Sequence, residues 1–283
     1  MDKSDLIKKI ILKKEFSQLP KKDVEKAFEK FNKPEYLDIE KIKLTRDLLR
    51  KVFTVFTSRK LLKDRDYDSD WILKKHISTK ERFDFYQKLY EKILNNLPEK
   101  IKTNSAKKNF SNFSFGNSKA KYSIKRKINV FDLGAGTNGF SYKYFEKKID
   151  YVGIESVGQL VDLMNRYFKK ENFKNRAKAV HLSLFELEKI KKIIKKTTGE
   201  KIIFLFKVVD SLEAFEKDYS KKLLLELTPL VDRVIISFAT KSLIKKQRFF
   251  VNRKWIIDFI KKNFKIVEIF ELNNEKYIMF EFR

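Results

Sequence analysis

The glycines of this sequence are concentrated in one segment. Of seven glycines in 283 residues, five lie within 25 residues, and Gly134, Gly136 and Gly139 follow the apolar run 128–133 at the spacing G-x-G-x-x-G. Glycine reaches positive φ and lets a backbone approach a ligand closely, so this clustering indicates a binding loop. A G-x-G-x-x-G turn between a strand and a helix is typical of nucleotide-binding sites.

Two carboxylates accompany the glycine loop. Glu155 follows Gly136 by 19 residues, at the end of the next predicted strand, where a carboxylate can accept both ribose hydroxyls of a nucleoside. The glycine motif alone fits NAD as well as S-adenosylmethionine. Asp132, directly before the glycines, would repel a pyrophosphate but attract a sulfonium and an amino group. Asp132 therefore favours S-adenosylmethionine as the cofactor.

The elements that would position these residues alternate between strands and helices. Short apolar runs predict strands at 128–133, 151–155, 177–182, 201–206 and 232–238. Helices are expected between them at 138–148, 157–170, 184–196, 211–227 and 253–263. Two alternating runs around an Asn-Asn-Glu turn predict a final β-hairpin. We expect an α/β fold, a doubly wound Rossmann-like sheet ending in an antiparallel hairpin, which is the layout of S-adenosylmethionine-dependent methyltransferases.

The sequence before this sheet divides into two parts. Residues 1–98 carry apolar positions at helical spacing and predict an all-helical region that docks on RNA, with a last helix at 76–97 that also borders the cofactor site. Segment 99–127 is expected to be a flexible basic insert. Its residues 101–127 contain eight Lys or Arg and no acidic residue. The cofactor-binding methyltransferase domain is expected over 128–283.

The charge of the chain indicates a polyanionic partner. There are 65 Lys and Arg against 38 Asp and Glu, a formal net charge of +27, and both halves are basic. Nucleic acid is the first expectation, before a membrane surface. The chain is also rich in Lys, Ile, Asn and Phe, and an AT-rich coding sequence would explain the excess of Lys without a polyanionic partner. Candidate RNA contacts are Lys107, Lys108, Lys125, Arg126, Lys127, Lys245, Lys246, Arg248 and Arg253.

Two aromatic residues lie among the second group of these cations. Phe249 and Phe250 follow the fifth predicted strand, near the edge of the sheet where ligands bind. One of them is a candidate to stack on a flipped base and position it, and packing under a loop is the alternative.

Residue types that are absent or rare exclude several classes of site. The chain has no cysteine, which excludes disulfides, thiolate metal sites and a cysteine nucleophile. Only His76 and His181 remain as imidazole ligands, so no metal site is expected. No run approaches the about 20 apolar residues of a membrane span, and no signal-peptide core is seen. We expect a cytoplasmic protein.

The chemistry of the methyl acceptor can be narrowed by the same reasoning. Without cysteine, covalent methylation at pyrimidine carbon 5 is excluded. The segment after the fourth strand reads FKVVDSLE and lacks the Asn/Asp-Pro-Pro-aromatic motif that methylates exocyclic amines. Guanine N7 fits what remains, because its lone pair carries no proton and no general base is required.

The segment from His76 to Arg82 carries a resemblance to a known family. It reads H-I-S-T-K-E-R and is similar to the H-x-S-T-x-E-R run of the aminoglycoside-resistance 16S rRNA methyltransferases. The similarity continues in the same order through 130–140, 204–216 and 234–243. It implies methylation of guanine N7 in the decoding-site helix of small-subunit rRNA, with S-adenosylmethionine as cofactor and aminoglycoside resistance as the result.

The resemblance also implies which residues contact the cofactor. Asp132, inferred above from its charge, is added to that set. Lys207 is in addition expected to help position the target base. Arg82 suits the methionine carboxylate, and Ser78 or Thr79 would cap a helix that starts near Lys80. The implied cofactor contacts are His76, Ser78, Thr79, Glu81, Arg82, Gly134, Ala135, Gly136, Glu155, Ser183, Leu184 and Lys207.

Other functions stay open at this point. A methyltransferase for another rRNA or tRNA position, such as adenine N1, would share the cofactor site. A DNA methyltransferase fits less well, and a non-catalytic ribosome-binding protein would bind subunits without methyl transfer. We expect a monomeric enzyme whose partner is the small ribosomal subunit.

Overall fold

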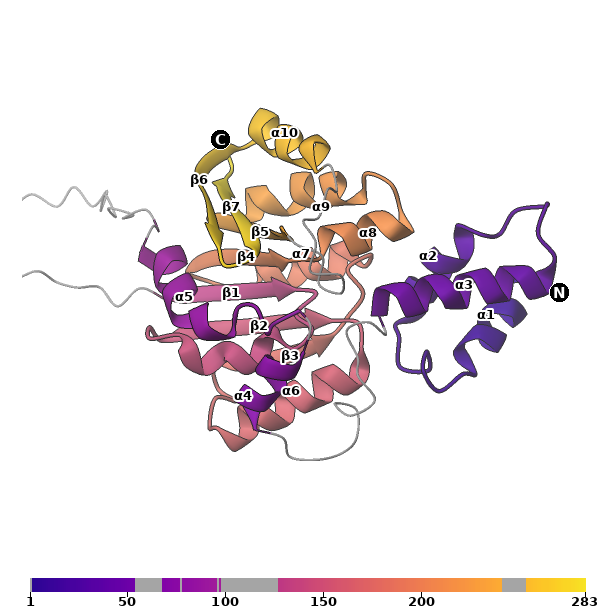
Figure 1. Ribbon diagram of the computed structural model, residues 1–283, viewed down its shortest axis with the longest axis horizontal. Coiled ribbons are helices and arrows are strands. Elements are labelled where there is room, and N and C mark those ends of the chain that lie inside the picture. The colour runs from indigo at the N-terminus through magenta and orange to yellow at the C-terminus, as the bar shows by residue number, and fades with distance from the viewer. Residues whose placement is uncertain (1, 54–67, 77, 96, 98–126, 241–252) are drawn as a thin grey trace, which may run out of the picture.

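The computed structural model describes residues 2–53, 68–76, 78–95, 97, 127–240 and 253–283. Its centre is a seven-stranded sheet in the order β3-β2-β1-β4-β5-β7-β6 (Figure 1). The strands are β1 (Ile128–Leu133), β2 (Ile149–Glu155), β3 (Ala177–His181), β4 (Glu200–Phe206), β5 (Arg233–Ala239), β6 (Lys265–Leu272) and β7 (Glu275–Glu281). The first five strands pair in parallel, whereas β7 pairs antiparallel with both β5 and β6. The predicted sheet and its terminal hairpin are confirmed.

Strand β1 lies at the point where the strand order reverses. The chain runs from β1 to β2 and β3 on one side, then returns to β4 on the other side of β1. All six residues of β1 are buried, as expected for a strand that is covered on both faces. In open α/β sheets, ligands bind beyond the carboxyl ends of the strands at such a reversal. The glycine loop begins there.

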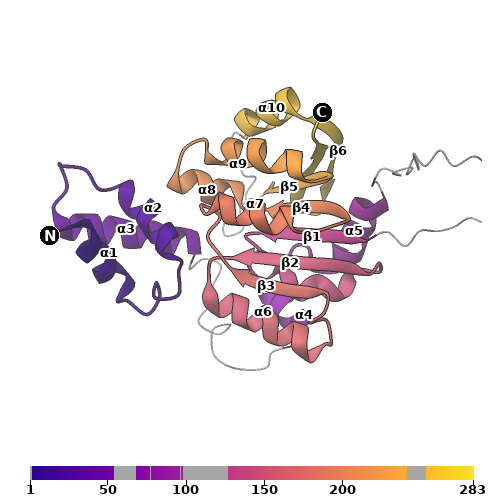
Figure 2. The same cartoon turned by 180° about the vertical axis from the view of Figure 1, so that it is seen from behind.

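Helices cover the sheet and form a separate group at the N-terminus. Figure 1 shows α5 on one face of the sheet, and the reverse view in Figure 2 shows α7 on the other. Helices α1 to α3 lie together beyond the carboxyl ends of the parallel strands (Figure 1). The α-helices are α1 (Lys3–Ile11), α2 (Lys21–Glu29), α3 (Asp38–Phe53), α4 (Ser69–Lys75), α5 (Tyr86–Asn95), α6 (Gly158–Lys170), α7 (Leu187–Lys195), α8 (Val209–Phe215), α9 (Tyr219–Leu227) and α10 (Lys254–Asn263).

The N-terminal helices have a core of their own and are fixed to the sheet domain. Leu6, Val24 and Leu49, one from each of the three helices, are almost fully buried. Lys26 forms an ion pair with Glu216 at 2.7 Å. The rings of Phe53 and Phe215 contact each other at a centroid distance of 5.8 Å. The helices α4 and α5, in contrast, pack on the sheet domain against the short helix η3 (Asn138–Tyr144).

Several predicted helix boundaries were wrong. The helix expected at 138–148 is the 3₁₀ helix η3, in which the Ser141 hydroxyl donates to the carbonyl of Asn138 and competes with α-helical pairing. The helix expected at 211–227 is broken into α8 and α9 at Asp218, whose φ is +63°. There the carboxylate of Glu213 accepts the backbone N–H groups of Asp218 and Ser220, which stabilises the break.

The helix expected near 76–97 is also shorter than predicted. It consists of a 3₁₀ turn, η2 (Phe83–Phe85), and α5, and it begins only after Arg82. The predicted basic insert at 99–127 lies outside the described residues, except for Lys127. None of the helices in the described part of the chain has the length and apolar composition needed to cross a bilayer.

Candidate active site

A cavity opens at the carboxyl ends of β1, β2 and β4 and extends to the N-terminal helices. Its apolar wall comes from both parts of the chain, with Val52 and Phe53 on one side and Leu184, Phe206 and Leu212 on the other. Its polar residues are concentrated at the strand ends. The polar side chains that line it are Asp23, Ser78, Arg82, Asp132, Asn138, Glu155, Ser156, Lys207 and Ser211.

The structure brings nine of the predicted cofactor residues to this cavity and leaves four behind it. The nine lining residues are Ser78, Arg82, Asp132, Gly134, Ala135, Gly136, Glu155, Leu184 and Lys207. The other four contact lining residues: Glu81 pairs with Lys207, Ser183 donates to Asp23, His76 contacts Ser78, and the carbonyl of Thr79 accepts the N–H of Arg82.

The glycine loop is held in place by backbone hydrogen bonds to β2. The N–H groups of Gly134 and Ala135 both donate to the carbonyl of Ile154, at 2.8 and 3.0 Å. Gly134 and Gly136 have φ values of +73° and +54°, in the left-handed region that favours glycine. The loop therefore turns sharply after β1 and presents its backbone to the cavity.

Alanine substitutions at these two glycines are expected to differ in their effect on stability. A Cβ at Gly134 would lie 2.7 Å from a methyl group of Val208, whereas one at Gly136 would meet no atom within 4 Å. Both variants carry left-handed strain of about 1–2 kcal/mol, and Gly134→Ala adds overpacking of about 1–3 kcal/mol. Urea unfolding should therefore show a clearly larger loss for Gly134→Ala than for Gly136→Ala. Equal losses would contradict this account.

The carboxylate of Glu155 is fixed at the end of β2. One oxygen accepts the N–H of Gly136 and the other accepts the N–H of Val157, each at 2.8 Å. The side chain is buried, and burial raises its pKa, although the backbone hydrogen bonds oppose that rise. Each carboxylate oxygen keeps a further lone pair for a ligand donor. This arrangement could accept the two adjacent hydroxyls of a ribose.

Asp132 lies beneath the glycine loop and is more deeply buried. One of its oxygens accepts hydrogen bonds from Asn138 and from the hydroxyl of Tyr151, both at 2.7 Å. Burial raises its pKa, and the two hydrogen bonds lower it in part. The cavity thus contains a carboxylate that can attract a cationic group of a ligand, while Arg82 can attract an anionic one.

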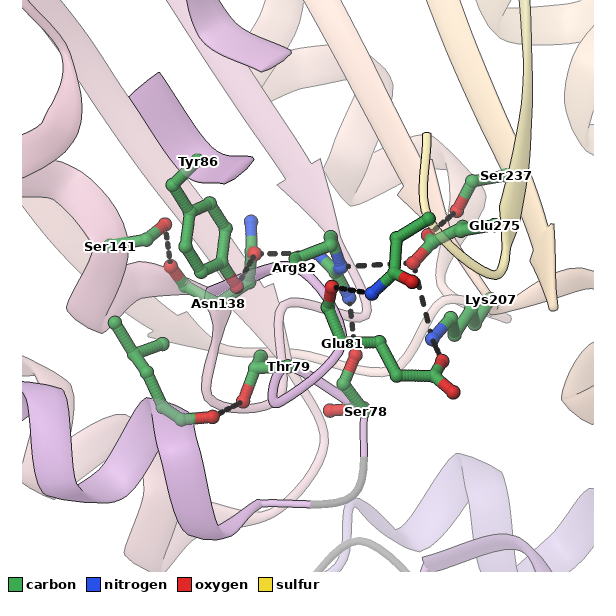
Figure 3. A network of polar contacts seen from close by, with 12 residues as sticks. Ser78, Thr79, Glu81, Arg82, Tyr86, Asn138, Ser141, Lys207, Ser237 and Glu275 are labelled. Atoms are coloured by element: carbon green, nitrogen blue, oxygen red, sulfur yellow. Dashed lines mark hydrogen bonds and ion pairs between the residues drawn. The ribbon is translucent and has the colours of Figure 1, made fainter. Parts of the chain in front are cut away.

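Four charged side chains form a buried ion-pair network beside the cavity (Figure 3). Glu275 lies between two cations, with one carboxylate oxygen 3.2 Å from Nε of Arg82 and 3.1 Å from Nζ of Lys207. Lys207 also pairs with Glu81 at 2.9 Å. The hydroxyl of Ser237 donates to the other oxygen of Glu275. The network joins the H-I-S-T-K-E-R segment to the ends of β4, β5 and β7.

Arg82 is oriented by uncharged groups as well. Its guanidinium donates to the side-chain carbonyl of Asn138 at 2.6 Å and to the backbone carbonyl of Ser78 at 2.8 Å (Figure 3). A guanidinium has five N–H donors in a fixed plane, so Arg82 can hold these partners and still present donors to an anion in the cavity.

Ser78 and Thr79 do not cap a helix, contrary to the prediction. Residues 79–82 form successive turns, in which Arg82 N–H donates to the carbonyl of Thr79, and the 3₁₀ helix starts only at Phe83. The Thr79 hydroxyl donates instead to the carbonyl of Leu73 at 3.0 Å, and so fixes the turn to the end of α4. Cap geometry needs the hydroxyl directly before the first helical turn, and here it lies too early.

Lys207 has an unusual backbone conformation directly after β4. Its φ is +60°, and its N–H donates to the carbonyl of Ser237 at 3.1 Å. A residue with a side chain at positive φ costs roughly 1–3 kcal/mol, and such strain concentrates at functional sites. The conformation turns Lys207 into the network with Glu81 and Glu275.

Sequence reasoning missed two acidic residues of this region, Asp23 and Glu275. Asp23 belongs to α2 and lines the cavity, where the Ser183 hydroxyl donates to it at 2.8 Å. Glu275 is the first residue of β7. Neither has a local motif around it. The only signal for Glu275 was an acidic residue at the start of a predicted strand whose middle, 277–280, is apolar.

Most of the predicted RNA contacts lie outside the described residues. These are Lys107, Lys108, Lys125, Arg126, Lys245, Lys246 and Arg248, together with Phe249 and Phe250. Lys127 is exposed and pairs with Asp150 at 3.3 Å. Arg253 is engaged internally, since its guanidinium donates to both oxygens of Asp210 and to the carbonyl of Ala239. These contacts connect the start of α10 to Asp210 in α8 and to the end of β5, and the RNA contact of Arg253 stays a prediction. In the described part of the chain, no three acidic or histidine side chains are grouped as metal ligands.

Comparison with solved structures finds the same architecture in rRNA methyltransferases. No family model matches this sequence, and a search of curated proteins finds no match. The chain superposes on 16S rRNA methyltransferase RmtF, solved with S-adenosyl-L-homocysteine, with a TM-score of 0.73 and 16% identity over all of both chains. It superposes on 16S rRNA methylase RmtB with a TM-score of 0.70 and 14% identity, over 100% of this chain and 99% of that one. For 16S rRNA methylase ArmA the TM-score is 0.53 at 21% identity, over 79% and 97%. This chain therefore has the fold of the 16S rRNA methyltransferases.

Proposed function

We propose that the protein is an S-adenosylmethionine-dependent methyltransferase that modifies guanine N7 in the decoding-site helix of 16S rRNA and thereby gives aminoglycoside resistance. One observation carries the proposal: Glu155, the glycine loop, Arg82 and Lys207 line one cavity at the carboxyl ends of the strands, and Glu275 pairs with both cations beside it. The fold agrees with it, since RmtF has the same architecture and was solved with S-adenosyl-L-homocysteine.

The residues of the cavity fit the three parts of this cofactor. Glu155 is a fixed acceptor for the ribose hydroxyls. Asp132 supplies a carboxylate for the amino group, and Arg82 supplies donors for the carboxylate of the methionine part. The apolar side chains Val157, Leu160 and Leu184 form a wall suited to a flat base. Every part thus has a matching group in the described residues.

Catalysis by this chain would rest on orientation. The bound cofactor supplies a methyl group on a sulfonium, and guanine N7 accepts it without losing a proton, so no side chain has to act as a general base. Lys207 would help to orient the target base, because it lines the same cavity and its ammonium is held by Glu81 and Glu275. Phe249 or Phe250 would stack on that base.

The substrate would be the assembled small ribosomal subunit. The net charge of +27 suits an extended phosphate surface, and phosphate contacts make such binding strongly dependent on salt. The helical region 1–98 and the basic insert 99–127 would dock on the rRNA. We propose that the enzyme acts as a monomer in the cytoplasm.

The test is the transfer of labelled methyl groups from S-adenosylmethionine to purified small subunits, large subunits, free 16S rRNA, tRNA and DNA. The product is mapped by reduction and strand cleavage, which is selective for N7-methylguanine. Label on small subunits with one cleavage in the decoding-site helix is expected. Label without that cleavage would overturn the N7 assignment in favour of another position, such as adenine N1. Binding to subunits without any transfer would indicate a non-catalytic ribosome-binding protein.

A further inference from the structure

Asp23 is a buried carboxylate in the cavity wall that the sheet domain does not supply. It comes from α2, in the N-terminal helices, and is 2% exposed. One of its oxygens, Oδ1, accepts the Ser183 hydroxyl at 2.8 Å. The other, Oδ2, is buried and has no hydrogen-bond partner among the described residues.

The surroundings of Asp23 do not favour its charge. Burial raises its pKa to about 7, with Glu155 and Glu186 adding repulsion and the hydroxyls of Ser183 and Ser156 opposing the rise. Buried polar atoms in proteins are nearly always hydrogen-bonded, since an unpaired one costs roughly 1–3 kcal/mol. An acceptor without a donor, in the wall of a ligand cavity, is therefore explained by a donor on the ligand.

The position of Asp23 indicates which part of the ligand would carry that donor. β3 is the neighbour of β2 on the side away from β1. Ser183, which holds Asp23, follows β3, whereas Glu155 ends β2. With a ribose on Glu155, the base of the nucleoside would extend toward β3 and the amino-acid part toward β1 and β4. Leu184 and Phe185 line the cavity on this side.

We propose that Oδ2 of Asp23 accepts a hydrogen bond from the exocyclic amine of the cofactor's adenine, so that the N-terminal helices complete the cofactor site. The inference rests on the proposed use of S-adenosylmethionine. An amine at position 6 donates to a carboxylate, whereas the carbonyl of hypoxanthine at the same position would repel it. Asp23 therefore selects adenine, and the N-terminal helices and the cofactor stabilise each other's binding to the sheet domain.

Calorimetric titration of the full-length protein with two ligands tests this role. S-adenosylhomocysteine carries the amine, and S-inosylhomocysteine carries a carbonyl in its place. The unmodified protein is expected to prefer the adenine ligand by about tenfold to a hundredfold at pH 8. In Asp23→Asn, whose amide can also donate, the preference should fall to within about threefold. Asp162→Asn, at an exposed position of α6, should keep the preference of the unmodified protein.

Ligand-free unfolding separates this role from a purely structural one. Asp23→Asn keeps the size of the side chain and removes a poorly compensated charge, so its melting temperature at pH 8 should equal or exceed that of the unmodified protein. Burial raises the pKa of Asp23 to about 7 from the usual 3.8, so the cost of ionising it in the folded protein grows as the pH rises from about 4 to 7. The gain in melting temperature of Asp23→Asn should therefore shrink toward pH 4.

The possible failures are distinguishable. If the unmodified protein binds no S-adenosylhomocysteine, the proposed function fails and this inference fails with it. If it binds but Asp23→Asn keeps the full preference for adenine, only the role of Asp23 is overturned. A loss of melting temperature in Asp23→Asn, with an equal loss of affinity for both ligands, would assign Asp23 a structural role and also overturn the inference.

Discussion

Replacing Glu155 with alanine is expected to lower the affinity for S-adenosylhomocysteine by about a hundredfold or more. The proposed site gives this carboxylate two ribose hydroxyls, and hydrogen bonds to a charged group contribute about 1.5–3 kcal/mol each. The same change leaves the N–H groups of Gly136 and Val157 without their acceptor, which loosens the glycine loop. Titration calorimetry measures the affinity directly.

The Glu155 prediction needs a graded variant and a matched control. Glu155→Gln keeps one acceptor oxygen and the size of the side chain, so its affinity for S-adenosylhomocysteine should lie between those of the unmodified protein and the alanine variant. Glu188→Ala removes an exposed carboxylate from the first turn of α7 and should change the affinity by less than twofold. A loss below threefold in Glu155→Ala would contradict the assignment of the ribose to Glu155.

The largest effect on stability is expected at Glu275. Its carboxylate is fully buried between Arg82 and Lys207. Burial alone would lower the pKa of the Arg82 guanidinium, but the attraction of nearby charges, with Glu275 foremost, raises it overall. Glu275→Gln leaves Arg82 without an ionic partner in the network, and removing one member of a buried ion pair costs about 3–5 kcal/mol. Urea unfolding at pH 7 should show a loss of free energy of unfolding in this range.

Methyl transfer should also be lost in Glu275→Gln, because Glu275 pairs with Arg82 and Lys207, which line the cavity. Glu271→Gln is the control, since this residue is exposed on the neighbouring strand β6 and should change the free energy of unfolding by less than about 0.5 kcal/mol. If the free energy of unfolding of Glu275→Gln lies within 1 kcal/mol of that of the unmodified protein, the network does not depend on this carboxylate.

The local parts of the site could be predicted because their signals are contiguous. The glycine loop, Asp132 and Glu155 lie within 24 residues, and two adjacent parallel strands bring them to one edge of the sheet. The hairpin was predicted from two alternating runs and a turn. The helix at 138–148 was wrong because apolar spacing does not reveal that the Ser141 hydroxyl bonds the backbone and that η3 ends at Tyr144.

The distant parts of the site have no such signal. Glu275 reaches Arg82 only because β7 inserts beside β5, which brings residues almost 200 positions apart into contact. Asp23 enters the cavity because the N-terminal helices lie beyond the carboxyl ends of the strands (Figure 1). Arg253 was predicted as an RNA contact from its charge and its place after the fifth strand, and neither signal shows that it also pairs with Asp210.

The fold class and the glycine loop follow from the sequence alone, because period-two and helical patterns and glycine conformations act over a few residues. Which charges meet inside the cavity depends on the tertiary structure. Whether an acidic residue such as Asp23 or Glu275 faces solvent or a buried cavity depends on how elements far apart in the chain are packed. Burial and distance to the opposite charge set the energy of an ionised group, and both quantities exist only in the folded chain.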